Sequence, residues 1–157
     1  MSRVERVEFS VPVVFGWQRA GHSGHFYKTR ETGKVQEIVA EAFKKALPEG
    51  AELPLFGGNV PVIMTVDTYR PLPVSRPKRV LSEPDTFKPD FDNIEKLIAD
   101  ALTGLAYEDD KQVVDCHTIK HPRVRDRAAR TDVTVCRGWD GSSRAEVDGN
   151  DNKEETR

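Results

Sequence analysis

The sequence predicts a single α+β domain with a mixed β-sheet and two main helices. At 157 residues the chain is long enough for one domain with its own core. Two segments repeat apolar residues at the three- and four-residue spacing of a helix that lies on a core. Four other segments are short and either alternate apolar with polar residues or run apolar throughout, as strands do. The predicted order is β-(β)-α-β-α-β-β, in which the bracketed strand is short.

The N-terminal part of the chain predicts one strand and a loop. Residues 7–11 alternate apolar and polar side chains, which predicts a half-buried strand that Pro12 ends. Residues 15–29 are glycine-rich and loop-like, with a short strand at 25–28. Basic residues alternate with aromatic ones in this loop, so it is either a surface for phosphates and bases or a simple connector. The sequence leaves both interpretations open.

A helix and a buried strand follow. The helix is predicted from Gly33 to Leu47, with Pro48 and Gly50 ending it. Its expected role is packing on the core, and packing in a dimer is a further possibility. Residues 60–69 read as a buried strand. The apolar side of the helix consists of Val35, Ile38, Val39, Ala42, Phe43 and Ala46.

Residues 70–89, called the basic arm below, form the long connection of the chain. Five prolines oppose regular structure there, and the arm is rich in lysine and arginine. A loop of this length inside a compact domain is usually functional or disordered. We interpret it as a mobile arm that closes on DNA, with a solvated flexible linker as the alternative. Its candidate DNA-binding residues are Arg76, Lys78, Arg79 and Lys88.

The segment after the basic arm predicts the second helix. Apolar residues from Ile94 to Leu105 fall on one side of a helix that runs from Asn93 to about Thr103. At about 100° per residue, Asp92, Lys96 and Asp100 fall on the opposite side. Gly104 is the expected C-terminal stop, because glycine enters the left-handed region at low cost.

Acidic residues crowd the entrance of this helix and follow its end. A capping function explains Asp92, with Glu95 three residues later completing a capping box, but it leaves Asp90 without a role. Clustered carboxylates instead suit a hard divalent cation such as Mg²⁺. Lys96 stands one turn from Asp92 and would place a positive charge where a phosphoryl oxygen gathers negative charge. Together these groups point to phosphodiester cleavage.

The C-terminal half predicts two more strands joined as a hairpin, at residues 112–120 and 131–136. Asp115, in the first of these strands, either orients a metal ligand without binding the metal itself or is a surface acid of an edge strand. The hairpin loop is rich in arginine and is the second candidate for phosphate contact. Its candidate DNA-binding residues are Arg123, Arg125 and Arg127.

The termini and composition define the limits of the domain. Residues 138–157 are rich in Gly, Ser and acids and predict a disordered acidic tail, which leaves residues 1–137 as the folded domain. The tail holds six acidic against three basic residues, so the net charge of −2 says nothing about nucleic-acid binding by the rest. No apolar run approaches the roughly 18 residues of a membrane span. We expect a cytoplasmic chain with Cys116 and Cys136 reduced.

Residues 89–115, PDFDNIEKLIADALTGLAYEDDKQVVD, resemble the signature of RusA-type Holliday junction resolvases. The shared features are D-x-D-N-x-x-K, a helix ending in D-A-L, and D-D-x-Q-V-V. The resemblance implies a RusA-like fold and a homodimeric, Mg²⁺-dependent endonuclease of bacterial or phage type, with Mn²⁺ as a substitute, that acts on branched DNA such as four-way junctions. Position by position, Asp90, Asp92 and Asp110 match the metal-binding aspartates, and Lys96 matches the catalytic lysine.

Two other classes of protein stay open. One is a non-cutting module that binds branched DNA, in which the acids only cap a helix. The other is a different Mg²⁺ phosphotransfer enzyme, but its DxD motif typically follows a buried strand directly, whereas Asp90 follows the basic arm. A calcium-binding EF-hand loop is disfavoured because Glu95 occupies the position that requires glycine. Of the neighbouring Asp109 and Asp110, the family motif aligns its essential acid with the second.

Overall fold

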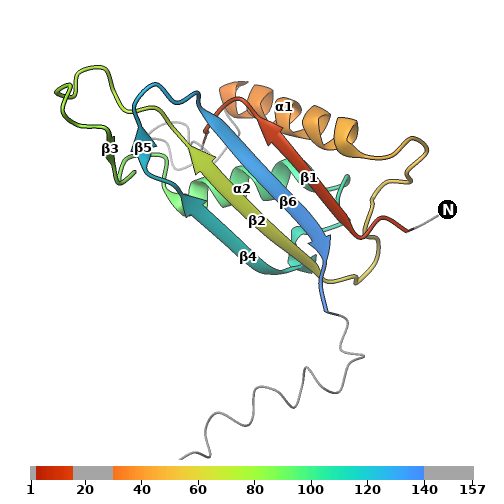
Figure 1. Cartoon of the computed structure of the whole chain (residues 1–157). Coiled ribbons are helices and arrows are strands. Elements are labelled where there is room, and N and C mark those ends of the chain that lie inside the picture. The colour runs from red at the N-terminus through yellow and green to blue at the C-terminus, as the bar shows by residue number, and fades with distance from the viewer. Residues whose placement is uncertain (1–2, 16–29, 140–157) are drawn as a thin grey trace, which may run out of the picture.

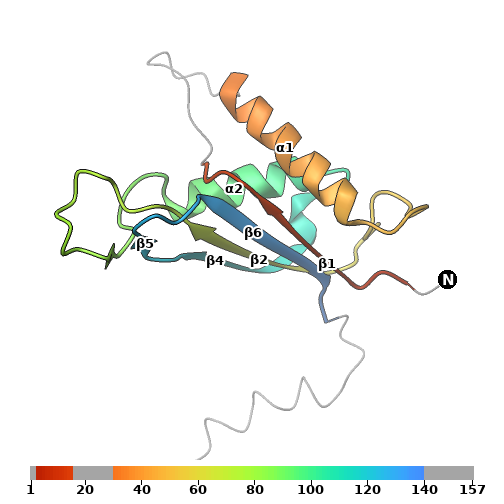
Figure 2. The same ribbon diagram turned by 45° about the horizontal axis from the view of Figure 1, so that its top comes forward.

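The computed structural model describes residues 3–15 and 30–139 of the 157-residue chain. Two helices cover one face of a four-stranded sheet, and a small two-stranded sheet lies at one end (Figure 1). Figure 2 shows both helices on the same side of the large sheet. The prediction of one α+β domain with a mixed sheet and two main helices is confirmed. The elements are β1 (Arg6–Val11), α1 (Arg30–Ala46), β2 (Val62–Tyr69), β3 (Ser82–Glu83), α2 (Phe91–Leu102), the 3-10 turn η1 (Asp110–Gln112), β4 (Val113–Lys120), β5 (Arg123–Val124) and β6 (Arg130–Arg137).

The large sheet has the strand order β1-β6-β2-β4. β6 is antiparallel to both of its neighbours, and β2 and β4 are parallel. The predicted hairpin between the last two long strands is therefore wrong, because β6 inserts between β1 and β2 instead of pairing with β4. The burial of the strands explains this order. β6 alternates buried with mostly half-buried residues, as a central strand does, whereas no residue of β4 is fully buried, as is usual for an edge strand.

The core lies between the helices and the large sheet. Alternate residues of β1, β2 and β6 point toward the helices and are buried. From α1, Val39 and Phe43 are fully buried, and the Phe43 ring meets Phe9 edge to face at 5.9 Å between ring centroids. Ile38, which was predicted on the core side of this helix, is instead 41% exposed. It lies at the margin of the apolar stripe, beside the free edge of β1.

The basic arm protrudes from one end of the large sheet together with residues 121–129 (Figure 1). Antiparallel pairing of β3 with β5 joins the two segments. Further backbone hydrogen bonds run from Leu72 N to Val124 O (3.0 Å) and from Arg125 N to Leu81 O (2.9 Å). The arm is therefore bonded to the rest of the described chain, and its mobility stays a prediction.

Some predictions fall on parts of the chain outside the described residues. These are the short strand at 25–28, the basic and aromatic side chains of 16–29, and the tail from residue 140 onward. Within the described ranges, neither helix combines the length and apolarity needed to cross a membrane.

Candidate active site between α2 and β4

Asp90 occupies the N-cap position of α2, with extended φ and ψ of −70° and 154°. The Asp90 side chain makes no capping hydrogen bond. Asp92 is the second residue of the helix, where its negative charge suits the helix N-terminus. The alternative in which Asp92 caps the helix and Glu95 completes a capping box is therefore wrong. Glu95 instead accepts a hydrogen bond from the Thr118 hydroxyl of β4, at 2.8 Å. Both aspartates at the helix entrance are exposed to solvent.

A pocket of about 280 Å³ lies between α2, η1 and β4. Three of the four predicted catalytic residues line it, namely Asp92, Lys96 and Asp110. Asp92 and Lys96 are one helical turn apart and therefore share a face of α2. Asp90, at the helix entrance, is not among the lining residues. The other lining residues are Met64, Glu95, Ala99, Asp100, Val113 and Cys116.

Lys96 has an acidic neighbour within the pocket. Its Nζ lies 3.9 Å from Oδ2 of Asp100, one turn further along α2. Solvent screens this pair because the side chains are 53% and 35% exposed. The pair therefore orients the ammonium group more than it stabilises the fold.

The two neighbouring aspartates of η1 have different surroundings. Oδ1 of Asp109 accepts a hydrogen bond from Lys111 N at 2.9 Å, and this bond holds the pKa of Asp109 below its ordinary value. Asp110 faces the pocket, where partial burial raises its pKa. The nearby carboxylates of Asp109 and Asp100 raise that pKa further, against the charge of Lys96. Asp110 is thus the member of the pair whose carboxylate lies at the pocket.

The pocket offers oxygen ligands, which are the ligands that Mg²⁺ prefers. Across residues 3–15 and 30–139, no three His, Cys, Asp or Glu side chains come together closely enough to hold a metal ion. The predicted cluster of Asp90, Asp92 and Asp110 is therefore not assembled as a three-carboxylate site in this part of the chain. Mg²⁺ usually takes only one or two carboxylates and completes its shell with water and substrate phosphate. The residues present fit such a partial site.

Cys116 forms part of the pocket lining without being a suitable metal ligand. Burial, and then the neighbouring Glu95, raise the pKa of its thiol to about 12. A hard cation such as Mg²⁺ also prefers oxygen ligands to sulfur, so Cys116 is not one of its expected ligands.

Three residues that shape this site have no predicted role in it from the sequence. Asp100 was placed on the polar side of the helix but given no role, although its i+4 spacing from Lys96 was the available signal. Glu95 was given no role in the site beyond a possible cap, but it lines the pocket. Gln112 appears in the D-D-x-Q motif. The structure shows that it is buried and that it is bonded both to residues 107–110, called the acidic loop below, and to the Phe56 carbonyl.

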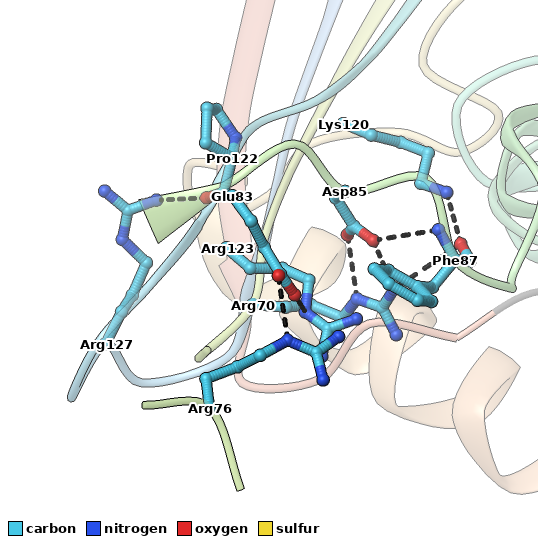
Figure 3. A network of polar contacts seen from close by, with 9 residues as sticks. All are labelled: Arg70, Arg76, Glu83, Asp85, Phe87, Lys120, Pro122, Arg123 and Arg127. Atoms are coloured by element: carbon cyan, nitrogen blue, oxygen red, sulfur yellow. Dashed lines mark hydrogen bonds and ion pairs between the residues drawn. The ribbon is translucent and has the colours of Figure 1, made fainter. Parts of the chain in front are cut away.

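Seven basic residues were predicted to bind DNA, and the structure divides them into two groups. Lys78, Arg79 and Lys88 are exposed on the basic arm. The other four form bonds within the protein, as Figure 3 shows for three of them. These four are Arg76, Arg123, Arg125 and Arg127.

Arg76 and Arg123 share the carboxylate of Glu83. Arg76 Nε donates to Oε2 at 2.9 Å, and Arg123 Nε lies 3.5 Å from Oε1 (Figure 3). The Arg123 guanidinium also lies 4.2 Å from the centroid of the Phe87 ring, a cation–π distance. The hydrogen bond from Arg76 is the main reason that the pKa of Glu83 is lowered. This cluster fixes the arm against β5.

Arg125 organises the turn of the basic arm. Its Nε and Nη2 donate to the Val80 carbonyl at 3.0 and 2.8 Å, and Nη2 also donates to the Pro77 carbonyl at 2.8 Å. Arg127 donates to the Pro122 carbonyl at 3.1 Å and lies 5.2 Å from the centroid of the Tyr69 ring. Direct contact of these two arginines with DNA stays a prediction.

The last residues of the basic arm lie against the end of β4 and lead into the entrance of α2. Lys120, at the end of β4, donates to the Phe87 carbonyl at 2.5 Å (Figure 3). Phe87 precedes the exposed Lys88, which is two residues before Asp90. The arm and the pocket are therefore both attached to β4 and to the entrance of α2.

An acidic pocket beside an arginine-rich arm on a single α+β domain is typical of a protein that acts on phosphate-bearing polymers. Residues 12–136 match the family described as Endodeoxyribonuclease RusA, and this match covers most of the chain. The chain belongs to the RusA endodeoxyribonuclease family, and the resemblance found in the sequence is confirmed.

A curated relative is also similar to part of the chain. It is the uncharacterized protein YqaN of Bacillus subtilis (strain 168), which is 43% identical over 76 residues. The match covers 41% of this chain and 54% of YqaN, so the chain spans about half the length of this relative.

Proposed function

We propose that this chain is a Mg²⁺-dependent, structure-specific endodeoxyribonuclease that resolves Holliday junctions or related branched DNA. The observation that carries the proposal is that Asp92, Lys96 and Asp110 line the same pocket, in a chain of an endodeoxyribonuclease family. Mn²⁺ is expected to replace Mg²⁺, since both accept carboxylate, phosphate and water oxygens.

The proposed chemistry is hydrolysis of one phosphodiester bond. Asp92 and Asp110 would hold the cation, and Asp90 at the helix entrance would bind it or one of its waters. A divalent cation at such a site supplies a Lewis acid that lowers the pKa of water and offsets phosphate charge. The carboxylates orient the attacking water, and the Lys96 ammonium stabilises the negative charge that develops on the phosphoryl or leaving oxygen.

The basic arm supplies the DNA contacts in this proposal. Lys78, Arg79 and Lys88 present exposed cations along it, and phosphate contacts of this kind position a duplex without reading its sequence. Arg76, Arg123 and Arg125 add positive charge while they hold the arm in shape, and Arg127 adds positive charge in the neighbouring loop. The DNA backbone would pass from the arm to the entrance of α2, next to the pocket.

A homodimer is part of the proposed function. A four-way junction offers two equivalent strands, and a dimer with two-fold symmetry would set one pocket on each. Light scattering coupled to size exclusion, with and without a synthetic junction, measures the mass directly. A monomer in both conditions would remove the two-fold arrangement from the proposal.

One observation favours a second candidate function, a non-catalytic module that binds branched DNA. The described residues contain no assembled three-ligand group. In this alternative only the basic arm and the arginine-rich loop at residues 121–130 matter, and the acids at the helix entrance serve only the N-terminus of the helix.

Cleavage of labelled four-way junctions separates the two functions. Wild type and Asp92→Asn would be incubated with fixed and mobile junctions, with and without Mg²⁺. We expect paired cuts by the wild type only when Mg²⁺ is present, and intact but shifted junctions with the variant. Shifted and uncut junctions for the wild type in both Mg²⁺ and Mn²⁺ would favour the binding module.

A further inference from the structure

The Gln112 side chain joins two segments that meet beside the pocket. Its Oε1 accepts hydrogen bonds from Glu108 N at 2.8 Å and from Asp109 N at 3.1 Å. Its Nε2 donates to the Phe56 carbonyl at 2.9 Å and to the Val60 carbonyl at 3.1 Å. Gln112 is only 4% exposed, so water does not compete for these four bonds.

The Nε2 group of Gln112 is bonded to the Phe56–Val60 segment, which leads directly into β2. Val60 lies two residues before β2, whose Met64 lines the pocket. The same segment is bonded to the chain after α2, through Leu55 N to Leu105 O and Phe56 N to Ala106 O, both at 2.8 Å. Gln112 therefore connects the acidic loop to a backbone segment that is itself hydrogen-bonded to the chain after α2.

We propose that Gln112 is a positioning residue that holds the Asp110 carboxylate at the pocket. The inference rests on the proposed nuclease function and adds a role for a residue outside the pocket lining. Gln112 closes the 3-10 turn that contains Asp110, with its own N–H donating to the Asp109 carbonyl at 3.0 Å. Fixing both ends of this short turn fixes the direction of the Asp110 side chain.

Only an amide side chain can accept hydrogen bonds from the loop N–H groups and also donate to the Phe56 and Val60 carbonyls. A glutamate at position 112 could accept from Glu108 and Asp109 but would face the Phe56 and Val60 carbonyls without a proton to donate. A leucine has a similar size but leaves two N–H groups and two carbonyls without their partner, and buried groups left this way are costly. Both substitutions should release the acidic loop while leaving Asp110 itself in the chain.

The experiment compares Gln112→Glu and Gln112→Leu with wild type and with Gln36→Leu. Gln36 is a buried glutamine of α1 that does not line the pocket, so it is a matched control for loss of a buried amide. Junction cleavage would be measured over a range of Mg²⁺ concentrations, well below the unfolding temperature of each variant. We expect kcat to fall and the Mg²⁺ concentration for half-maximal rate to rise about 10- to 100-fold in the Gln112 variants. The affinity for the junction in Ca²⁺ should stay within about twofold, since Gln112 touches no DNA-contact residue.

A second measurement does not depend on cleavage. Amide hydrogen exchange followed by NMR should show slow exchange at Glu108 and Asp109 in the wild type and in Gln36→Leu. Exchange at these two amides should be faster in both Gln112 variants, without a change in β2 or β6.

Normal kcat and Mg²⁺ dependence in a folded Gln112 variant would overturn the inference. It would also be overturned if Gln36→Leu lost activity in the same proportion, because the effect would then follow stability alone. Absence of cleavage by the wild type would instead count against the proposed function, while the exchange result would still test the hold of Gln112 on the loop.

Discussion

The guanidinium of Arg70 binds both carboxylate oxygens of Asp85, with Nε 2.8 Å from Oδ2 and Nη2 2.5 Å from Oδ1 (Figure 3). The Asp85 side chain is fully enclosed and that of Arg70 is 21% exposed. Burial would by itself raise the pKa of Asp85, but the hydrogen bonds and charge of Arg70, and the nearby charge of Lys120, keep it lowered. This pair links the end of β2 to the last part of the basic arm.

We expect Asp85→Ala to destabilise the protein in a pH-dependent way. Because the pKa of Asp85 is lower in the folded state, its ionised form stabilises the fold above the unfolded-state pKa of about 3.9. That stabilisation is lost as the pH falls through the folded-state pKa. The variant leaves Arg70 without its partner, which should cost about 3 kcal/mol at pH 7. Urea unfolding at pH 7 and pH 3 should show a smaller difference from wild type at the lower pH.

The exposed Glu49→Gln is a suitable control for this experiment, since the change lies far from the pair in a solvated turn. Its free energy of unfolding should follow that of the wild type at both pH values. An equally large effect of Asp85→Ala at pH 7 and pH 3 would mean that lost packing, and not the ion pair, is responsible.

We expect Asp92→Asn and Asp110→Asn to abolish junction cleavage while binding persists or tightens. Each substitution removes a negative charge that faces the DNA phosphates, so repulsion decreases as the cation site is lost. Asp90→Asn should behave in the same way if Asp90 also serves the cation. Single-turnover cleavage in Mg²⁺ and gel shifts in Ca²⁺ measure the two properties separately.

Asp109→Asn provides the matched control for this set. Asparagine is as good an N-cap as aspartate, so η1 should keep its shape while a charge next to Asp110 but outside the pocket lining disappears. We expect its cleavage rate to stay within about tenfold of wild type, since the capping bond to Lys111 N is kept. Parallel loss of binding and cleavage in a folded Asp92 or Asp110 variant would argue against their role in catalysis.

Lys96→Ala should slow cleavage without changing the Mg²⁺ requirement. Loss of one well-placed charge-stabilising donor typically costs about 10²- to 10³-fold in kcat. Asp100→Asn removes the ion pair at 3.9 Å that orients Lys96, and we expect a smaller loss of about tenfold. Lys111→Ala, an exposed lysine of the same region, should cut normally. Near-normal rates for Lys96→Ala would exclude Lys96 from the mechanism.

The half of the pocket carried by α2 could be predicted from the sequence, because helix geometry places Asp92, Lys96 and Asp100 on one face whatever surrounds the helix. The arrival of Asp110 at that face depends on the path of the chain after Gly104, and periodicity contains no information on that path. The role of Asp110 in the site was predicted from a sequence motif. The physical cause of its position at the pocket is the bonding of Gln112 to the Phe56–Val60 segment.

Strand order was not predictable for a related reason. Residues of β4 and β6 are close in the sequence and suggested a hairpin, but the decision depends on burial on both faces of the sheet. Val133 and Val135 are almost fully buried, whereas Val114 is 65% exposed, so β6 takes the interior position. Composition also did not reveal that the Arg125 guanidinium is bonded to the Val80 and Pro77 carbonyls, because local charge carries no information on the partners of a side chain.

The two groups of basic residues should respond differently to substitution. Lys78→Ala and Arg79→Ala remove exposed cations, so each should weaken junction binding and reduce the slope of log K against log salt by about 1. Arg125→Ala should instead loosen the turn at residues 76–80, because the guanidinium is bonded to the carbonyls of Arg76, Pro77 and Val80. We expect faster protease cleavage in the basic arm of this variant than in Lys78→Ala or Arg79→Ala, measured by limited proteolysis beside salt-dependent binding titrations. If Arg125→Ala reduced the salt slope while the arm stayed protease-resistant, Arg125 would be a direct phosphate contact after all.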